Sequence, residues 1–259
     1  VTSVLTCPRR YFLSRQARGE AGIGLAATLG SLIHLLVQQV VIDGLELSDL
    51  RVRLDEVWDR LPFGARWLSA SERVEVDLAL QRFLNWRAAR TTELVGVEVP
   101  FSLELSVGEH EVLLEGKVDW LERTDSGLQV VDFKTSRTQP TKAEIAGLEQ
   151  LGVYQLAIDH GGFGQVGAGS AGASAVYLRQ AGRPEDLPKE FGQESLRAVP
   201  HLTCEPGELA FPTWVHQRVA AAASVVAEGS YPATPGVHCR ACPFATSCPV
   251  SERGRQVAP

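Results

Sequence analysis

The sequence predicts an α/β fold in which a central mixed sheet is flanked by helices. Two observations carry this prediction: hydrophobic residues recur at helical spacing up to residue 92, and β-branched residues then alternate as they do in strands. Helical spacing returns once before a further strand, which is typical of mixed α/β architecture. With 259 residues, of which 44% are hydrophobic, the chain can bury one substantial core, as a single domain or as two small ones.

Residues 1–92 are predicted to be mostly helical, because apolar side chains recur on one face of four stretches. The four predicted helices span residues 1–16, 28–44, 49–61 and 70–90. The second is the clearest, since apolar residues stand at intervals of four from Leu32 to Val40 and Gly44 follows as a stop.

Residues 93–180 are predicted to form the sheet and one helix. Alternating and β-branched residues predict strands at residues 93–107, 110–123, 127–136 and 173–179. The second and third of these strands are joined by the turn Thr124–Gly127, and residues 148–161 return to helical spacing.

Residues 181–259 are predicted to hold a last helix, at residues 213–229, and a group of cysteines near the end. Cys239, Cys242 and Cys248 follow the pattern C-x2-C-x5-C. Three thiolates do not complete a tetrahedral zinc site or the ligand set of an iron–sulfur cluster. A further ligand from elsewhere in the chain is therefore expected.

The charge distribution gives a mixed signal about partners. A net charge of −6 argues weakly against nucleic acid, whereas several arginines cluster locally and predict either a basic groove or solvated helix faces. These arginines are Arg9, Arg10, Arg15, Arg18, Arg82, Arg87 and Arg90. The chain has neither an apolar run of the roughly 18 residues that a transmembrane helix needs nor a signal peptide, so no membrane partner and a cytoplasmic location are expected. Because it lacks methionine and begins with Val1, we expect it to be cut from a longer protein.

The turn Thr124–Gly127 sets the register of the two strands that it joins. Counted inward from the turn, Asp119 falls opposite Asp132, where Cβ atoms lie about 4.5–5.5 Å apart and two carboxylates repel unless a cation lies between them. Lys134 projects from the same face as Asp132, because residues two apart in a strand point the same way. The same register puts Lys117 opposite Lys134, an unfavourable match unless one side chain bends away.

Two carboxylates and a lysine in this arrangement suit the hydrolysis of a phosphodiester. A Mg²⁺ or Mn²⁺ ion polarises a phosphate and lowers the pKa of bound water, and an adjacent lysine orients that water. The alternative is a D-x-K sequence without function, which is common after an apolar strand. His34, on an otherwise apolar helix, is either a core histidine or a third metal ligand that suits Mn²⁺. Gln150 and Tyr154 stand four apart on one helical face, where they suit a phosphate oxygen.

Short motifs follow one another along the whole chain. In order, they are "LTCPRRYFL", "GSLIH", "GKVDW", "VVDFKT", "QLGVY" and the terminal cysteines. Together they resemble the motifs of the RecB-family nucleases of the PD-(D/E)xK superfamily. The segments "LTCPRRYFLSRQARGE" and "LGVYQLAIDHGGF" look like the C-terminal nuclease module of the actinobacterial AdnA/AdnB helicase-nucleases. The resemblance implies a restriction-endonuclease-like sheet in a single nuclease domain over residues 1–259, although Val118 stands where the superfamily name puts proline.

The resemblance also implies a set of metal ligands. His34, Asp119 and Asp132 would bind Mg²⁺ or Mn²⁺. A backbone carbonyl would be a further ligand, and of Val131 and Phe133 we favour Phe133, the x of D-x-K.

Four other residues receive a role from the resemblance. Lys134 would be the catalytic lysine, and Gln150 with Tyr154 would match the Q-x3-Y motif of the family beside the DNA. Glu98 stands where related members often carry a glutamate, so it is a further candidate site residue.

The same resemblance implies which residue is the fourth ligand beside the three C-terminal cysteines. In the iron–sulfur members of this family one N-terminal cysteine joins three C-terminal ones, and Cys7 stands at that place. Cys7, Cys239, Cys242 and Cys248 would then hold a [4Fe-4S] cluster. Zinc is the structural rival, although four-cysteine zinc sites usually use two C-x2-C pairs and the sequence has one. Cys204 is left over as a free thiol without an assigned role.

These expectations combine into a metal-dependent deoxyribonuclease that cleaves single-stranded DNA during double-strand-break end resection, in DNA repair and recombination. No G-x4-GK[ST] motif occurs, so the helicase motor that the resemblance implies is expected upstream in the same chain, together with a partner subunit. One alternative is a catalytically silent module that binds DNA or acts as a scaffold. A second is an iron–sulfur redox protein.

Overall fold

The computed structural model describes residues 1–19, 24–164, 169–199 and 212–255. Its internal contacts divide the chain into two compact units. The terminal unit comprises Val1–Ile23, Glu104–Leu113 and Pro200–Pro259, and the sheet unit comprises Gly24–Leu103 and Leu114–Val199. That the two together form a single nuclease domain stays a prediction.

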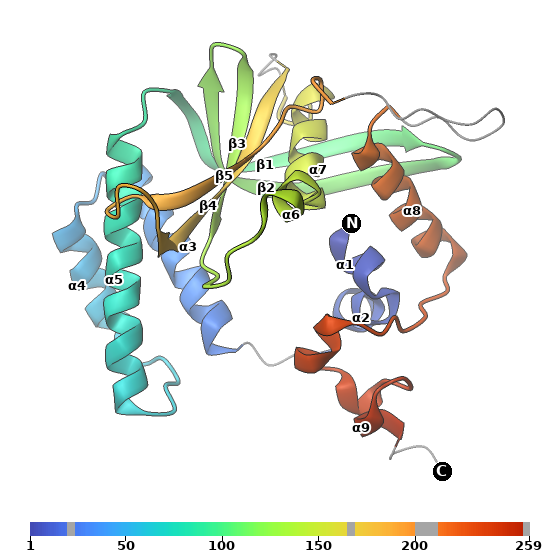
Figure 1. Cartoon of the computed structure of the whole chain (residues 1–259), viewed down its shortest axis with the longest axis horizontal. Helices are drawn as coiled ribbons and strands as arrows, with labels where there is room; N and C mark the ends of the chain where they lie inside the picture. The colour runs from blue at the N-terminus through green and yellow to red at the C-terminus, as the bar shows by residue number, and fades with distance from the viewer. Residues whose placement is uncertain (20–23, 165–168, 200–211, 256–259) are drawn as a thin grey trace. The chain divides into compact units, whose positions relative to one another are not determined.

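The sheet has five strands and is mixed, which confirms the predicted fold class (Figure 1). In sheet order, the strands are β1 (Glu93–Val107), β2 (His110–Thr124), β3 (Gly127–Lys134), β4 (Ser170–Ala181) and β5 (Pro188–Gln193). β2 runs antiparallel to β3, β3 parallel to β4, and β4 antiparallel to β5. The first four strands lie where the sequence predicts them, whereas β5, with the short and mostly polar sequence PKEFGQ, was not predicted.

The register between β2 and β3 is the predicted one. Arg123 pairs with Leu128, and the ladder continues to the pair Trp120 and Val131. The next positions along the two strands are Asp119 and Asp132. The pairing therefore brings the two aspartates to the end of the same ladder.

Helices cover both faces of the sheet (Figure 1). They are α3 (Leu25–Asp43), α4 (Leu47–Trp58) and α5 (Arg66–Ala88) on one face, and α6 (Lys142–Ala146) and α7 (Glu149–Asp159) on the other. Trp120, Val131 and Phe133 are buried in the core under α3 to α5, and Val118 and Val130 in the core under α7. The successive residues Val130 and Val131 of β3 thus point to opposite cores, as the alternation predicts.

The helix α3 begins at Leu25, three residues before the predicted start, because the helix formers Leu25, Ala26 and Ala27 extend it to Gly24. It ends at Gly44, which adopts the left-handed conformation expected of a stop. Among the described residues, α3 is long and apolar enough to cross a membrane, with a mean hydropathy of 1.8. No such segment was predicted from the sequence. The buried face of α3, which includes Ile33 and Val40, lies in the core.

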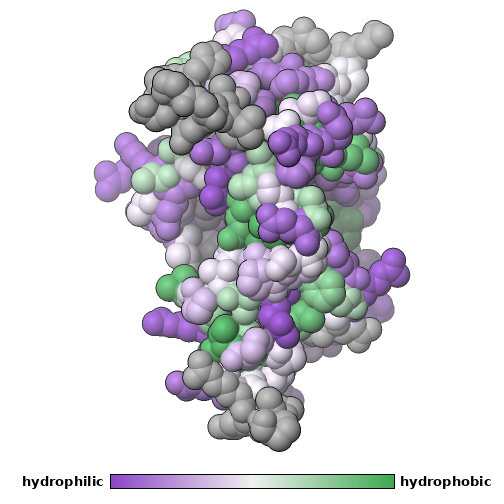
Figure 2. Space-filling model, turned by 90° about the vertical axis from the view of Figure 1, so that its right-hand side faces the viewer, coloured by the Kyte–Doolittle hydropathy of each residue, from purple (hydrophilic) through white to green (hydrophobic). Residues whose placement is uncertain are grey.

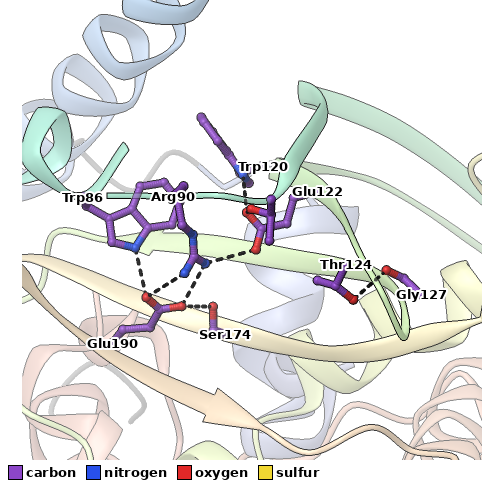
Figure 3. A network of polar contacts seen from close by, with 9 residues as sticks. Trp86, Arg90, Trp120, Glu122, Thr124, Gly127, Ser174 and Glu190 are labelled. Atoms are coloured by element: carbon purple, nitrogen blue, oxygen red, sulfur yellow. Dashed lines mark hydrogen bonds and ion pairs between the residues drawn. The ribbon is translucent and has the colours of Figure 1, made fainter. Parts of the chain in front are cut away.

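A polar network in the sheet unit ties the end of α5 to β2 and β5 (Figure 3). The Arg90 guanidinium lies 3.1 Å from carboxylate oxygens of both Glu122 and Glu190. The indole nitrogen of Trp120 donates to Glu122 and that of Trp86 to Glu190. The Glu122 side chain is only 1% exposed, so the network compensates a buried charge. It also fixes Trp120, the residue that follows the first candidate aspartate.

The arginines predicted as a basic groove or a solvated face on α5 serve this internal role instead. Arg82 donates to the backbone carbonyl of Leu178, and Arg87 donates to that of Val40. With Arg90 in the polar network, the group holds the sheet unit together.

The terminal unit contains short helices at both ends of the chain. Among its described residues they are α1 (Thr2–Thr6), α2 (Pro8–Tyr11), the π-helix η1 (Phe12–Gln16), α8 (Trp214–Glu228), the 3₁₀-helices η2 (Val237–Ala241) and η3 (Ala245–Ser247), and α9 (Glu252–Arg255). The predicted continuous helix over residues 1–16 is therefore wrong. Cys7 is extended, because the proline ring of Pro8 disfavours the helical conformation in the residue before it. On the face that Figure 2 shows, small groups of hydrophobic residues lie among hydrophilic ones.

Candidate metal and catalytic site

One cavity of about 560 Å³ in the sheet unit brings together all the predicted catalytic and divalent-metal residues. It is lined by His34, Glu98, Lys117, Asp119, Asp132, Phe133, Lys134, Thr135, Ser136, Gln150 and Tyr154. These residues come from α3, β1, β2, β3, α7 and the loop after β3. Residues more than 100 positions apart in the sequence thus converge in one place.

Three of these side chains form a group that fits a metal ion. One ligand atom each of His34, Glu98 and Asp119 lies within 4.8 Å of the other two. The Nδ1 atom of His34 is 3.4 Å from Oδ1 of Asp119. Burial lowers the pKa of His34, but the Asp119 carboxylate, with Asp132 and Glu98 behind it, outweighs burial and raises the pKa overall. The imidazole therefore sits in an environment built for positive charge.

Glu98 reaches this group from a strained backbone. Its φ of 50° lies in the left-handed region, which costs a non-glycine residue free energy and is found disproportionately at functional sites. Its Oε2 atom is 2.6 Å from Nζ of Lys117. Lys117 thus bends toward Glu98, which resolves the mismatch with Lys134 that the register predicts.

The orientation of Asp119 is set by the neighbouring strand. Its Oδ2 atom accepts a hydrogen bond of 2.7 Å from the backbone amide of Phe133. The Phe133 ring packs edge-on against Phe83 and Trp86 in the core. Packing of the Phe133 ring in the core thereby fixes the backbone amide that orients the Asp119 carboxylate. The role of the Phe133 carbonyl as a metal ligand stays a prediction.

Asp132 is a buried carboxylate whose two oxygens contact Gln150 and Lys134. It is 3% exposed, and its Oδ1 atom accepts a hydrogen bond of 3.0 Å from Gln150. Nζ of Lys134 lies 2.6 Å from Oδ2, so each oxygen of the Asp132 carboxylate has a polar neighbour. Burial raises the pKa of Asp132 to about 6, against the lowering effect of Lys134, and the charge of Asp119 adds to the rise. A buried carboxylate needs a compensating cation, and the neighbouring Lys134 ammonium supplies one.

Gln150 and Tyr154 support the aspartate and the lysine. The Gln150 amide accepts from Nζ of Lys134 at 2.7 Å and donates to Asp132 and to the Tyr154 hydroxyl. Tyr154 is 8% exposed, and burial followed by the charge of Asp132 raises the pKa of its phenol. The sequence predicted this pair beside a phosphate, whereas in the structure Gln150 links Asp132, Lys134 and Tyr154.

Lys117, Thr135 and Ser136 line the cavity although sequence reasoning assigned them no role. Lys117 stands two positions before Asp119 in the same strand, so alternation already put it on the same face and was a usable signal. Thr135 meets α3 so closely that a Cβ atom on Gly30 would lie 2.9 Å from its Oγ1. No sequence pattern predicts that contact, because it depends on how α3 packs.

A second cavity, of about 380 Å³ in the terminal unit, is lined by Cys7, Cys239, Cys242 and Cys248. Cys7 is buried at the extended residue between α1 and α2, and the other three lie in or just after η2 and η3. None of the four is in a disulfide. Among the described residues, three potential ligand atoms of different side chains lie within 4.8 Å of one another only at His34, Glu98 and Asp119. No three of the four thiols are therefore that close to one another. Cys204 lies outside the described residues.

Comparisons with known proteins agree with this geometry at the level of the superfamily. The sequence matches the PD-(D/E)XK nuclease superfamily over residues 1–249. No curated protein matches it. Among solved structures, the crystal structure of SSO0001 is similar, with a TM-score of 0.39 and 16% sequence identity over 86% of this chain and 97% of that one.

Proposed function

The chain belongs to the PD-(D/E)XK nuclease superfamily, and from this premise we propose that it is a deoxyribonuclease that hydrolyses phosphodiester bonds of single-stranded DNA with Mg²⁺ or Mn²⁺. The observation that carries the proposal is the convergence of His34, Asp119, Asp132 and Lys134 on one cavity. A histidine, two carboxylates and a lysine are the groups that metal-dependent phosphodiester hydrolysis needs.

The side chains fit a divalent ion. The buried carboxylate of Asp132 and the close group of His34, Glu98 and Asp119 offer hard oxygen ligands and one imidazole nitrogen. His34, Asp119 and Asp132 would hold the ion, with Glu98 and the Phe133 carbonyl as further ligands. The imidazole suits Mn²⁺ more than Mg²⁺. When bound, the ion supplies Lewis-acid polarisation of a phosphate oxygen and a lower pKa of bound water.

The chain's own residues prepare the other half of the chemistry. Lys134 brings an ammonium beside the metal-binding edge, where it orients water and offsets negative charge that develops on phosphate. Gln150 holds that ammonium and Asp132 at once, so a single amide sets their relative positions. Tyr154, whose raised pKa keeps it protonated, completes the hydrogen bonding of Gln150.

Incubation of the purified chain with end-labelled single-stranded DNA tests the proposal, with Mg²⁺, Mn²⁺ or a chelator. We expect cleavage with either ion and none with the chelator. Asp132→Asn should abolish cleavage while circular dichroism shows an unchanged fold. Lys134→Ala should be nearly inactive and yet bind Mn²⁺ in calorimetry. A folded Asp132→Asn variant that cleaves at the wild-type rate contradicts the proposal, and DNA binding without cleavage by the wild type indicates the silent module instead.

For the terminal unit we propose that Cys7, Cys239, Cys242 and Cys248 hold a [4Fe-4S] cluster. Four thiolates around one zinc ion at ~2.3 Å would bring their sulfur atoms about 3.8 Å apart. The thiols here are spread around a cavity of about 380 Å³, with no three of them within 4.8 Å. What supports a shared cofactor is that all four cysteines line one cavity, and four thiolates are the ligand set of a [4Fe-4S] cluster. Iron, sulfide and zinc analysis of anaerobically purified protein decides between the two, and one zinc without iron would refute the cluster.

The biological setting is part of the same proposal. We place the nuclease in the cytoplasm, in double-strand-break end resection, downstream of a helicase motor in the same chain and beside a partner subunit. The support is the sequence resemblance to helicase-nucleases. Co-purification of a longer native protein with DNA-dependent ATPase activity tests it.

A further inference from the structure

A further cavity of the sheet unit adjoins the candidate catalytic cavity. It has a volume of about 560 Å³ and shares His34, Glu98, Lys117 and Thr135 with the first. The rest of its lining comes from one helix, α3: Ala26, Ala27, Gly30, Ser31, Leu35 and Gln38. The two cavities therefore form one continuous groove that passes through the candidate metal site. We call the part along α3 the α3 groove.

The α3 groove has a floor of small side chains. Ala26 and Ala27 lie one helical turn before Gly30 and Ser31, so these four residues share a face of α3. None of them extends beyond a hydroxyl group. A bulky, charged chain such as a sugar-phosphate backbone can therefore approach the helix closely.

The titratable side chains that line the α3 groove are those of Lys117, Glu98 and His34. The Lys117 side chain is 62% exposed, and its ammonium is 2.6 Å from Glu98. Glu98 is also one of the candidate metal ligands. Once a cation shares the charge of Glu98, the ammonium of Lys117 is no longer fully compensated and attracts a further anion. No acidic residue of α3 lines the groove to oppose it.

We propose that the α3 groove binds the phosphodiester next to the scissile one, with Lys117 as its cation and Ser31 and Gln38 as hydrogen-bond donors. The inference rests on the proposed nuclease function and deepens it, because it assigns a path to the strand that leaves the catalytic cavity. Lys117 is thereby a substrate-binding residue. A strand held at two successive phosphates is also fixed in direction, which positions the scissile bond.

DNA binding without cleavage tests this path. The affinity of fluorescein-labelled dT12 is measured by anisotropy in Ca²⁺ over a range of KCl concentrations. We expect Lys117→Gln to weaken binding roughly three- to tenfold at low salt and to reduce the slope of log affinity against log salt by about 0.7, the value for one phosphate contact on a single strand. Lys142→Gln, which removes the same charge from exposed α6 outside both cavities, should match the wild type. A Lys117→Gln variant with wild-type affinity and slope overturns the inference.

A measurement of Mn²⁺ binding distinguishes a phosphate contact of Lys117 from a role that is limited to its ion pair with Glu98. If Lys117 only neutralises Glu98, its loss changes Mn²⁺ affinity in calorimetry and leaves the salt slope unchanged, and that result also overturns the inference. We expect the opposite: Mn²⁺ binding at least as tight as in the wild type, with the reduced salt slope.

A substrate with a single phosphodiester completes the test. The p-nitrophenyl ester of thymidine 5′-monophosphate has no neighbouring phosphate for the α3 groove. Lys117→Gln should therefore lower kcat/KM on dT12 by a larger factor than kcat/KM on the ester, and an equal loss on both substrates contradicts the inference. If the wild type cleaves neither substrate with Mn²⁺, the proposed nuclease function fails, whereas the salt slope in Ca²⁺ still decides whether Lys117 contacts a phosphate.

Discussion

The two candidate cofactor sites are built in opposite ways. In the sheet unit, the candidate metal ligands project from two paired strands and from α3. Their neighbours Val118, Val131 and Ile33 are fully buried. In the terminal unit, Cys239 is exposed, and Cys242 and Cys248 follow 3₁₀-helices of five and three residues. One site is supported by a core, and the other by short turns.

This difference indicates what each cofactor does for the fold. Hydrogen bonds and packing fix the carboxylates of the sheet unit, so a metal ion meets ligands that are already in place. Turns as short as η2 and η3 are not stable alone. Within the described part of the terminal unit, the contacts that join the two chain ends include a 3.2 Å hydrogen bond from Arg9 to the Ser247 carbonyl and the stacked rings of Phe12 and Tyr231. A cofactor on the cysteines would therefore act as a crosslink.

Removing one cysteine should have the largest effect, because the terminal unit is expected to depend on its cofactor for stability. Treated as a crosslink between Cys7 and Cys239, the cluster contributes about 5 kcal/mol by the chain-entropy model, and total domain stabilities are typically ~5–15 kcal/mol. We expect Cys7→Ser to be colourless and poorly soluble. Hydrogen exchange should show loss of protection in the terminal unit and unchanged protection in β2, β3 and α5. Cys204→Ser, the matched control, should stay brown.

A wild-type melting temperature and protection pattern in Cys7→Ser would mean that the terminal unit folds without its cofactor. The two sites would then be equally preformed, and they would not differ in how far each unit depends on its cofactor.

The sheet unit should respond in the opposite sense, because its site stores an unfavourable charge. The pKa of Asp132 is about 6 in the folded protein against an ordinary value of 3.8, so the metal-free fold gains stability from protonated Asp132 at low pH and loses it as the pH rises through about 6. The loss amounts to roughly 3 kcal/mol at most, because each tenfold change in the protonation equilibrium corresponds to about 1.4 kcal/mol. Without metal, Asp132→Asn should therefore be more stable than the wild type at pH 7.

Urea unfolding of both proteins at pH 4 and pH 7 checks this sign. The advantage of Asp132→Asn should shrink toward pH 4 and should be reversed by saturating Mn²⁺, which stabilises the wild type by mass action. A variant that is less stable than the metal-free wild type at pH 7 shows that Asp132 serves the fold instead of the site.

His34 offers a finer test of whether the preformed group binds metal. It lies on α3 between buried Ile33 and Leu36, yet its imidazole faces Asp119. We expect His34→Ala to lower Mn²⁺ affinity in calorimetry by at least roughly tenfold, since even outer-shell partners of a metal contribute about 10- to 100-fold. The melting temperature should change little. Unchanged Mn²⁺ affinity with a lower melting temperature identifies His34 as a core histidine.

How far the sequence predicts this molecule depends on the range of the interactions involved. The register from the turn to the pair of Trp120 and Val131 follows from alternation and a turn, both local, and it is confirmed. Asp119 and Asp132 stand at the next positions of the two strands. The short helix α6 was missed although its capping box, Thr141 with Glu144, is a local signal. The break at Cys7 was likewise readable from the proline after it.

Tertiary geometry accounts for what sequence patterns could not supply. Glu98 became a candidate only through family resemblance, because its left-handed backbone interrupts the alternation from which a strand face is inferred. The ion pair of Glu98 with Lys117 and the use of Gln150 as a link between Asp132 and Lys134 depend on distances that only the fold sets. The predicted residues are brought together, and their division of labour emerges from these contacts.

The smallest expected effect concerns the fit of α3 against the loop after β3, on which the preformed position of His34 depends. A methyl group on Gly30 would lie 2.9 Å from Oγ1 of Thr135, closer than such contacts normally are, so α3 or the loop must shift. Against this, alanine is favoured over glycine inside a helix by roughly 0.5–1 kcal/mol. We expect Gly30→Ala to change stability by no more than about 1 kcal/mol and to weaken Mn²⁺ binding, because His34 lies one turn further along α3. Thr135→Ala removes the oxygen and leaves Cβ at 4.0 Å, so the double variant should recover the Mn²⁺ affinity of Thr135→Ala alone. Additive losses in this double-mutant cycle would show that the contact does not position His34.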